Sequence, residues 1–134
     1  MLAVIPVLNW GDAQAVTNTV EEEVVINTYQ FPMSTSTIRL ILEREFVEDP
    51  RLVDVARCES RFRQWDSQGN PLRGEINPKD VGVMQINEKY WLAESIKLGH
   101  DIYTLEGNIE MAKHILKVQG INAWSWSSHC HLHK

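Results

Sequence analysis

The chain has 134 residues, of which 43% are hydrophobic and 23% are charged, and its formal net charge is −5. This length allows one domain with a single hydrophobic core of modest size. The acidic balance argues against nucleic acid as a partner, because binding to phosphates needs a basic surface. No stretch approaches the roughly 20 apolar residues of a membrane-spanning helix. We therefore expect a globular domain with no membrane span.

The N-terminal part differs from the rest of the chain. Residues 1–34 have no sustained hydrophobic period, and we expect a leader and linker with little order. Residues 1–8 are apolar and are followed by small residues at Ala13 and Ala15, as in an export signal, although the basic start of such a signal is missing. The alternative is a mobile N-terminus. Residues 35–134 are expected to form the folded domain.

Two helices are predicted at the start of this domain. The hydroxyl residues at 34–37 can cap a helix that carries Ile38, Leu42 and Phe46 on one face. Asp49-Pro50 supplies the cap and the first-turn proline of a second helix, which we expect to run to about residue 62.

Two more helices follow an irregular segment. Residues 64–80 are rich in Asp, Asn, Gly and Pro, which predicts a hairpin-like excursion. Asn87 can cap a third helix that ends at Gly99, and Thr104 can cap a fourth that ends at Gly120. The expected fold class is mainly α (α+β), with one small β-hairpin between the second and third helices.

One carboxylate interrupts the hydrophobic face of the second helix. Apolar residues at three- and four-residue spacing form a core-facing stripe, and Glu59 lies in its middle. The stripe consists of Leu52, Val55, Ala56 and Phe62. A carboxylate there is either paired with a cation such as Arg63 or partly desolvated, which raises its pKa. A raised pKa keeps the proton near neutral pH, so Glu59 is a candidate general acid.

The residues around Glu59 occur in a recognisable order. Residues 58–62 read Cys-Glu-Ser-Arg-Phe, residues 80–87 read Asp-Val-Gly-Val-Met-Gln-Ile-Asn, and an Asn-Ile pair stands at 108–109. Over about residues 50–130 the chain resembles the lysozyme-like lytic transglycosylases. The resemblance implies a lysozyme-like fold and a peptidoglycan glycan strand as substrate. It also implies that Glu59 acts as acid and then base on the β-1,4 bond between N-acetylmuramic acid and N-acetylglucosamine, leaving 1,6-anhydromuramic ends.

The same motifs give the candidate substrate-binding residues, which are Ser60, Gly82, Met84, Gln85, Asn108 and Trp124. A hydroxyl, an amide or a bare backbone can face a sugar, and an indole can stack on one. Each also has a structural interpretation. Ser60 can be solvated, Met84 and Trp124 can be core residues, and Asn108 can hold a loop. Asn87 is expected to cap its helix. Trp124 stands where the transglycosylases usually have a tyrosine, which leaves the orientation of Glu59 open.

Asp80 introduces a second chemistry. Asp-x-Gly-x-x-Gln-Ile-Asn also resembles the animal-type lysozymes, in which that aspartate is the second catalytic carboxylate. A lysozyme-type hydrolase that uses Glu59 and Asp80 is therefore the alternative to a transglycosylase that uses Glu59 alone. Asp80 can instead be a turn residue after Asn77-Pro78. A third alternative is a non-catalytic cell-wall-binding module that keeps the fold.

The two cysteines bear on the cellular compartment of the protein, and the histidine-rich end bears on metal binding. Cys58 and Cys130 can form a disulfide in an oxidising compartment or be two unrelated buried thiols. A wall substrate favours the disulfide and an exported protein that is periplasmic, cell-wall-associated or extracellular. His129, His131 and His133 alternate around Cys130, but short histidine-bearing termini are usually solvated. We predict no metal site, no cofactor and a monomer.

Overall fold

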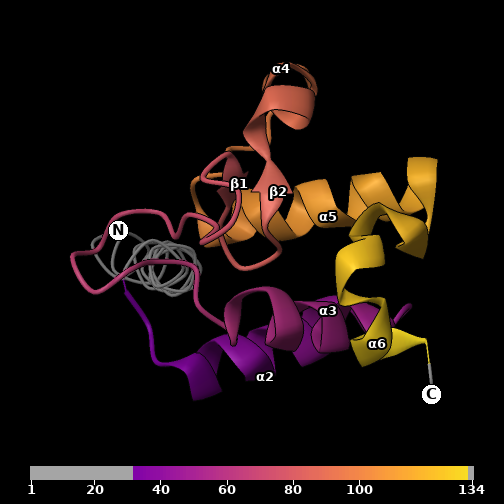
Figure 1. Ribbon diagram of the computed structural model, residues 1–134, viewed down its shortest axis with the longest axis horizontal. Coiled ribbons are helices and arrows are strands. Elements are labelled where there is room, and N and C mark those ends of the chain that lie inside the picture. The colour runs from indigo at the N-terminus through magenta and orange to yellow at the C-terminus, as the bar shows by residue number, and fades with distance from the viewer. Residues whose placement is uncertain (1–31, 133–134) are drawn as a thin grey trace, which may run out of the picture. The chain divides into compact units, whose positions relative to one another are not determined.

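The structure is a computed structural model that describes residues 32–132. The expected leader and the export-signal hypothesis fall on residues that lie, up to residue 31, outside this range. Within it, no helix is long and apolar enough to cross a membrane. The elements in chain order are the helices α2 (Thr35–Glu45) and α3 (Arg51–Ser60), the strands β1 (Asp80–Val81) and β2 (Ile86–Asn87), the helices α4 (Glu88–Leu98) and α5 (Leu105–Gln119), the 3-10 helix η1 (Ile121–Ser127) and the helix α6 (Ser128–His131) (Figure 1).

The predicted capping residues begin and end three of these helices. Ser34, Asn87 and Thr104 each accept a backbone N–H with a side-chain oxygen at the start of α2, α4 and α5. Gly99 and Gly120 follow the last residues of α4 and α5 and have positive φ angles. A residue without a Cβ adopts that conformation at little cost. The expected mainly α fold with a small β excursion is confirmed.

Helix α3 is shorter than predicted. The Asp49 carboxylate accepts the N–H of Arg51 at 3.2 Å, so it serves the first turn as expected. The helix ends at Ser60, because Arg61 and Phe62 both take left-handed conformations, with φ angles of 54° and 62°. Such angles are uncommon for residues other than glycine, and no residue pattern here predicted them. Phe62 therefore leaves the helical stripe on which it was placed.

The β excursion is confirmed between α3 and α4, but its paired strands lie at its end. Strand β1 pairs antiparallel with β2, with Asp80 opposite Asn87 and Val81 opposite Ile86. The connecting turn, residues 82–85, is the middle of the motif rather than part of the turn-rich segment before it. That earlier segment is held by isolated β-bridges.

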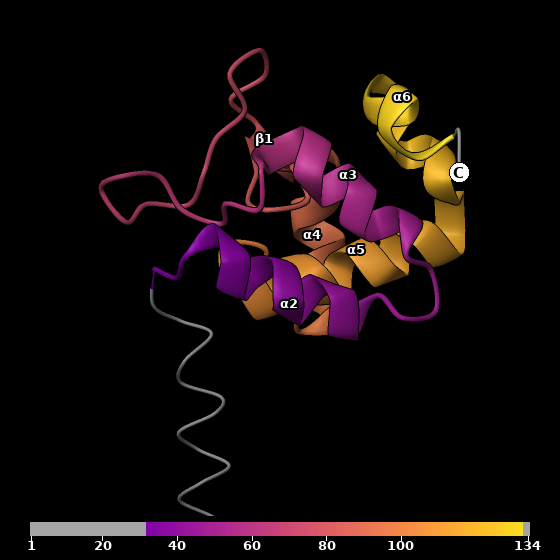
Figure 2. The ribbon, with the colours of Figure 1, turned by 90° about the horizontal axis from the view of Figure 1, so that it is seen from below.

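The core brings α3 against three other elements. Ile38, Leu42 and Phe46 are buried on one face of α2, as predicted. Helix α3 packs on α2 on one side and on η1 and α6 on another, and η1 also contacts α5. Figures 1 and 2 show the C-terminal elements lying beside α3, although they are far from it in sequence. The end of the chain is therefore built into the surroundings of α3.

Candidate active site

Glu59 lies in the last turn of α3, half-buried and not ion-paired with the expected cation. Its neighbours on the inner side of the helix, Val55 and Ala56, are fully buried. Arg63, the expected ionic partner, instead donates its Nε to the carbonyl oxygen of Ser60 at 3.0 Å. The alternative of a structural Glu59–Arg63 ion pair is therefore not what the structure shows.

The surroundings of Glu59 raise its pKa. Burial is the main cause, because it disfavours the charged form, and the negative charge of Asp80 acts in the same direction. A hydrogen bond with the Ser127 side chain and the proximity of His129 and His131 lower the pKa without cancelling the effect of burial. Glu59 consequently holds its proton to higher pH than an exposed glutamate does, as a general acid requires.

Asp80, the second candidate carboxylate, is held in place across the small sheet. Its Oδ1 accepts a hydrogen bond from Nδ2 of Asn87 at 2.8 Å. The two residues face each other because they are register partners in β1 and β2. Asn87 also caps α4, since its Oδ1 accepts the N–H of Lys89 at 3.1 Å. The backbone N–H of Asp80 closes a turn onto Asn77, as the turn interpretation expected, but the carboxylate itself is oriented by Asn87.

Asn108 has a structural role rather than the expected sugar contact. Its side chain is fully buried, and its Oδ1 accepts the N–H of Met84 at 2.9 Å. Its Nδ2 donates to the carbonyl oxygens of Val81 and Ile102, at 2.9 and 2.8 Å. Because these bonds use both amide hydrogens and the oxygen, the side chain has no strong donor left for a substrate. Of the two interpretations, the loop contact is the one observed.

Gly82 and Met84 also differ from their expected roles. Gly82 has a φ of 75°, and a Cβ there would collide with the side chains of Asn108 and Gln64. The glycine thus makes room for protein atoms, not for a sugar ring. Met84 is fully buried in the core. Gln85 is half-buried, and its Nε2 donates to the carbonyl oxygen of Gly82 at 2.9 Å. It stays a candidate for substrate contact.

The Ser60 hydroxyl is used within the end of α3. It donates to the carbonyl oxygen of Ala56 at 3.0 Å and accepts the N–H of Arg63 at 3.2 Å, and the residue is buried. The alternative of simple solvation is therefore wrong, and the hydrogen of the hydroxyl is used within the protein. Ser60 instead stabilises the turn at which the chain leaves the helix.

The tryptophans near the end of the chain are arranged differently from expectation. Trp124 is buried and donates its Nε1 to the carbonyl oxygen of Met84 at 2.9 Å, so its indole N–H is used within the protein, against the β1–β2 turn. Trp126, two residues later, is 95% exposed. Trp91 is half-buried and makes an edge contact with His114.

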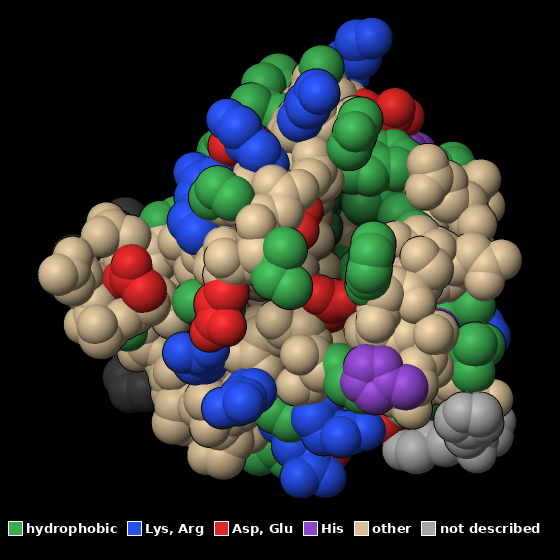
Figure 3. All heavy atoms as spheres, viewed as in Figure 1, with side chains coloured by type: hydrophobic (Ala, Val, Ile, Leu, Met, Phe, Trp, Pro, Cys, Tyr) green, Lys and Arg blue, Asp and Glu red, His purple; other side chains and the backbone are tan. Residues whose placement is uncertain are grey.

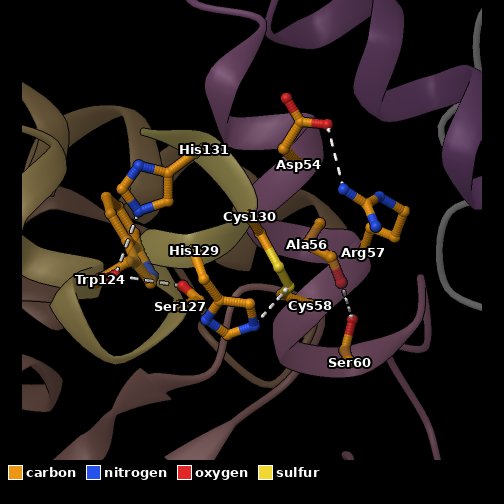
Figure 4. The surroundings of a disulfide bond; sticks show 10 residues. All are labelled: Asp54, Ala56, Arg57, Cys58, Ser60, Trp124, Ser127, His129, Cys130 and His131. Carbon is orange, nitrogen blue, oxygen red and sulfur yellow. Dashed lines mark hydrogen bonds and ion pairs between the residues drawn. A yellow bond between two sulfur atoms is a disulfide. The ribbon is translucent and has the colours of Figure 1, made fainter. Parts of the chain in front are cut away.

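A disulfide joins the helix of Glu59 to the C-terminal segment, as predicted. Cys58 precedes Glu59 on α3 and is bonded to Cys130 on α6, with 6.4 Å between their Cα atoms (Figure 4). His129 is exposed and its Nε2 lies 3.7 Å from Cys58 Sγ. His131, expected to be solvated, is buried with its Nε2 3.2 Å from the carbonyl oxygen of Trp124. His133 lies outside the described residues.

The comparisons with known proteins agree with this arrangement. No family model and no solved structure matches the chain. It is 34% identical to sheep (Ovis aries) lysozyme C-3 over 113 residues, which cover 69% of this chain and 73% of that protein. It is 31% identical to the lysozyme of Galleria mellonella over 102 residues, which cover 66% of this chain and 82% of that protein. The chain belongs to the lysozyme family. It is also 34% identical to goat (Capra hircus) lysozyme C-1 over 89 residues, 52% of this chain and 67% of that protein.

Sequence reasoning missed two residues near the candidate carboxylates, Gln64 and Ser127. Gln64 is fully buried; its Oε1 accepts the N–H of Val83 at 2.8 Å, and its Nε2 donates to the carbonyl oxygen of Tyr103 at 3.2 Å. It fixes the turn between Asp80 and Asn87. Ser127, in the C-terminal segment, is one of the groups that lower the pKa of Glu59. The one sequence signal for this proximity was the possible disulfide, which ties residue 58 to residue 130.

Figure 3 shows a face of the molecule on which acidic side chains lie next to hydrophobic ones. A separate pocket of about 390 Å³ lies between the end of α4 and the segment that leads to α5, and neither candidate carboxylate lines it.

Proposed function

We propose that this member of the lysozyme family hydrolyses the β-1,4 bond between N-acetylmuramic acid and N-acetylglucosamine in peptidoglycan, with Glu59 and Asp80 as its two carboxylates. The proposal rests on one observation: two carboxyl groups, those of Glu59 and Asp80, lie near each other in different surroundings. Glu59 is half-buried with a raised pKa, and an Asn87-held Asp80 lies close enough to contribute to that pKa. Enzymes that cleave glycosidic bonds usually use two carboxyl groups held in different environments.

In the first step Glu59 donates its proton to the glycosidic oxygen while the bond from that oxygen to the anomeric carbon breaks. The positive charge that develops on the sugar ring is stabilised by the Asp80 carboxylate, either as an ion pair or by a covalent bond to the anomeric carbon. A water molecule then attacks that carbon. Glu59, now a carboxylate, takes the proton of the water and returns to its acid form.

Asp80 is suited to its role by its hydrogen bond. The Asn87 amide donates to the carboxylate oxygen and fixes the direction of the carboxylate. The charge of Asp80 in turn helps Glu59 to keep its proton.

The hydrolase is placed ahead of the lytic transglycosylase that the sequence motifs favoured. A transglycosylase needs one glutamate, because a hydroxyl of the muramic acid itself closes the anhydro ring. That reaction would not use a second carboxylate such as Asp80. The relatives with the stated identities are lysozymes. In addition, Trp124 stands where the transglycosylases usually have a tyrosine. Its indole N–H is bonded to Met84, and a tryptophan has no hydroxyl to offer Glu59.

The proposed substrate also fixes the compartment. Peptidoglycan lies outside the cytoplasm, and the Cys58–Cys130 disulfide is a bond that persists in oxidising compartments. We infer that the protein is exported and acts as a monomer on the glycan strand. The proposed chemistry requires no cofactor.

The test is cleavage of purified peptidoglycan by the full chain, with mass spectrometry of the products. Hydrolysis gives reducing ends, whereas a transglycosylase gives anhydro ends that are lighter by one water. We expect Glu59→Gln to lower the rate at least about 100-fold. Asp80→Ala should cripple a hydrolase and leave a transglycosylase active. Glu75→Gln, on an exposed carboxylate of the same excursion, is the matched control and should keep full activity.

Two outcomes would overturn parts of the proposal. Anhydro products from an Asp80→Ala variant of undiminished activity would replace the hydrolase with the transglycosylase. Binding to peptidoglycan without cleavage, unchanged by Glu59→Gln, would leave only a wall-binding module.

A further inference from the structure

Three potential metal ligands meet where α6 lies beside α3. They are the sulfur atoms of Cys58 and Cys130 and a ring nitrogen of His129, and these ligand atoms all lie within 4.8 Å of one another. Nε2 of His129 is 3.7 Å from Sγ of Cys58, and Figure 4 shows the imidazole beside the disulfide. The cluster joins two helices that are far apart in the sequence, and the proposed hydrolysis uses none of its members as a reacting group.

The oxidised form of the chain does not offer these sulfurs to a metal. A thiolate is the sulfur species that binds metal ions, and here the two sulfurs are bonded to each other. A small thiol of the glutathione class breaks this bond when two of its molecules give their hydrogens to the protein sulfurs and join as a disulfide. A chain has this dithiol form before it reaches an oxidising compartment. Cys58 is half-buried and His129 is exposed, so the cluster can be reached from solvent.

The distances in the cluster fit a tetrahedral zinc ion. With Zn–S bonds of about 2.3 Å and a Zn–N bond of about 2.0 Å, a sulfur and a nitrogen ligand stand about 3.6 Å apart and two sulfurs about 3.8 Å apart. The 3.7 Å between His129 Nε2 and Cys58 Sγ is close to the first of these values. The Cα atoms of Cys58 and Cys130 are 6.4 Å apart, near the long end of the roughly 4.4–6.8 Å found in disulfides. The released sulfurs can therefore separate by rotation of their side chains.

The kinds of ligand select the metal. Two thiolates and one imidazole suit Zn²⁺, whereas Mg²⁺ and Ca²⁺ prefer oxygen ligands. Zinc bound by three protein ligands takes a water molecule as its fourth. Binding replaces the two thiol protons of Cys58 and Cys130, which are released to solvent.

We propose that the reduced chain binds Zn²⁺ through Cys58, His129 and Cys130. The ion links α3 to α6, so it holds together the same two helices that the disulfide joins in the oxidised chain. Oxidation by a small disulfide reverses the binding. The two protein sulfurs then bond to each other, the small disulfide leaves as two thiolates, and Zn²⁺ is released. The cluster is thus a zinc site in the reduced form and a disulfide in the oxidised form.

The proposed site differs from a set of alternating histidines. His131 is 2% exposed, and its Nε2 lies 3.2 Å from the carbonyl oxygen of Trp124. Arg57, which precedes Cys58, lies 3.6 Å from the Asp54 carboxylate, so its positive charge is partly offset. One histidine and two cysteines therefore form the ligand set.

The experiment adds Co²⁺, and then Zn²⁺, to the full chain after reduction with a phosphine under argon. Tetrahedral Co²⁺ with thiolate ligands gives characteristic visible and near-ultraviolet absorption, which Zn²⁺ should abolish by displacement. The oxidised chain should show none of this absorption. We expect His129→Ala and Cys58→Ser each to weaken Zn²⁺ binding by more than about 10-fold, since even residues that only support metal ligands contribute that much. His100→Ala, which removes a half-buried histidine beyond the end of α4, is the matched control and should bind as the wild type does.

Circular dichroism and urea unfolding distinguish a folded site from binding to loose thiols. Zn²⁺ should raise the urea midpoint of the reduced wild type and leave that of the oxidised wild type unchanged. If reduction alone diminishes the helical signal, Zn²⁺ should restore it in the wild type and not in Cys58→Ser. Absence of the Co²⁺ absorption, equal Zn²⁺ affinities of the wild type and His129→Ala, or binding that leaves the helical signal of an unfolded reduced chain unrestored would each overturn the proposal. None of these measurements depends on cleavage of peptidoglycan.

Discussion

The β1–β2 turn and the C-terminal segment, residues 121–131, both lie beside the candidate carboxylates, but they do opposite things. In the turn, residues 82–85, Gly82 and Met84 lie against other protein atoms, whereas Gln85 stays a candidate for substrate contact. The C-terminal segment was expected to be an aromatic and solvated tail. It instead packs against α3, and its Cys130 forms a disulfide with Cys58, the neighbour of Glu59.

The difference shows which role the residues of the motif at 80–87 have in the structure. The turn is enclosed by the side chains of Gln64, Asn108 and Trp124, each of which bonds its backbone. Buried backbone groups need such partners, so the motif residues are fixed by the architecture that places Asp80. Residues near Glu59, in contrast, can come from any segment of the chain that packs beside α3.

The C-terminal segment should depend on its covalent link. The double variant Cys58→Ser, Cys130→Ser is expected to lose about 4 kcal/mol of unfolding free energy in the chain-entropy view of a loop of this length. Urea unfolding of the two proteins measures the loss. A reducing agent should lower the stability of the wild type and leave the double variant unchanged. Equal stabilities of the two proteins would mean that packing alone holds the segment.

The turn should depend on Asn108. Asn108→Ala leaves the N–H of Met84 and two carbonyl oxygens without their buried partner, which should cost about 3 kcal/mol. Asn122→Ala, at an exposed position of η1, is the control and should change stability by less than about 0.5 kcal/mol. Similar urea midpoints for these two variants would show that the turn is not held as described.

The contact between the two regions runs through Trp124. Trp124→Phe removes the hydrogen bond to the Met84 carbonyl and part of the buried volume, and about 2 kcal/mol of stability should be lost. Trp126→Phe makes the same chemical change on an exposed side chain and should be nearly neutral. Thermal unfolding of both proteins makes the comparison. A larger loss for Trp126→Phe would contradict the assignment of Trp124 as the link.

The smallest effect concerns Glu59 itself. Its pKa in the folded protein is raised above the usual 4.5, so its favourable contribution to stability is complete below that pH and is lost as the pH rises through the raised value. Glu59→Gln should therefore be more stable than the wild type at pH 7, and the difference should close below pH 4.5. Urea midpoints across this pH range measure it. A variant less stable than the wild type at pH 7 would contradict the raised pKa.

The sequence predicted what depends on neighbours along the chain. Helix caps such as Ser34 and Thr104 act within three residues, so their pattern is local and was confirmed. The position of Glu59 on an apolar face is equally local. The end of α3 was missed because Arg61 and Phe62 adopt left-handed angles without a glycine to announce them.

The partners of the site residues depend on distant parts of the chain. Whether Asn108 faces a sugar or a backbone N–H is decided by Met84, 24 positions earlier. The support of Asp80 by Asn87 follows from a strand register that was not specified in advance. The packing of the C-terminal segment on α3, beside Glu59, was suggested only by the two cysteines.

The disulfide has a consequence for proteolysis. Cys58 and Cys130 are 72 residues apart, so the bond closes a ring that contains Glu59, Asp80 and every element from β1 to η1. Ile76 is fully exposed on this ring, between the two carboxylates. A protease that cuts there would interrupt the chain between Glu59 and Asp80, yet both fragments would stay in one molecule. Separation of the fragments on a gel would then require a reducing agent.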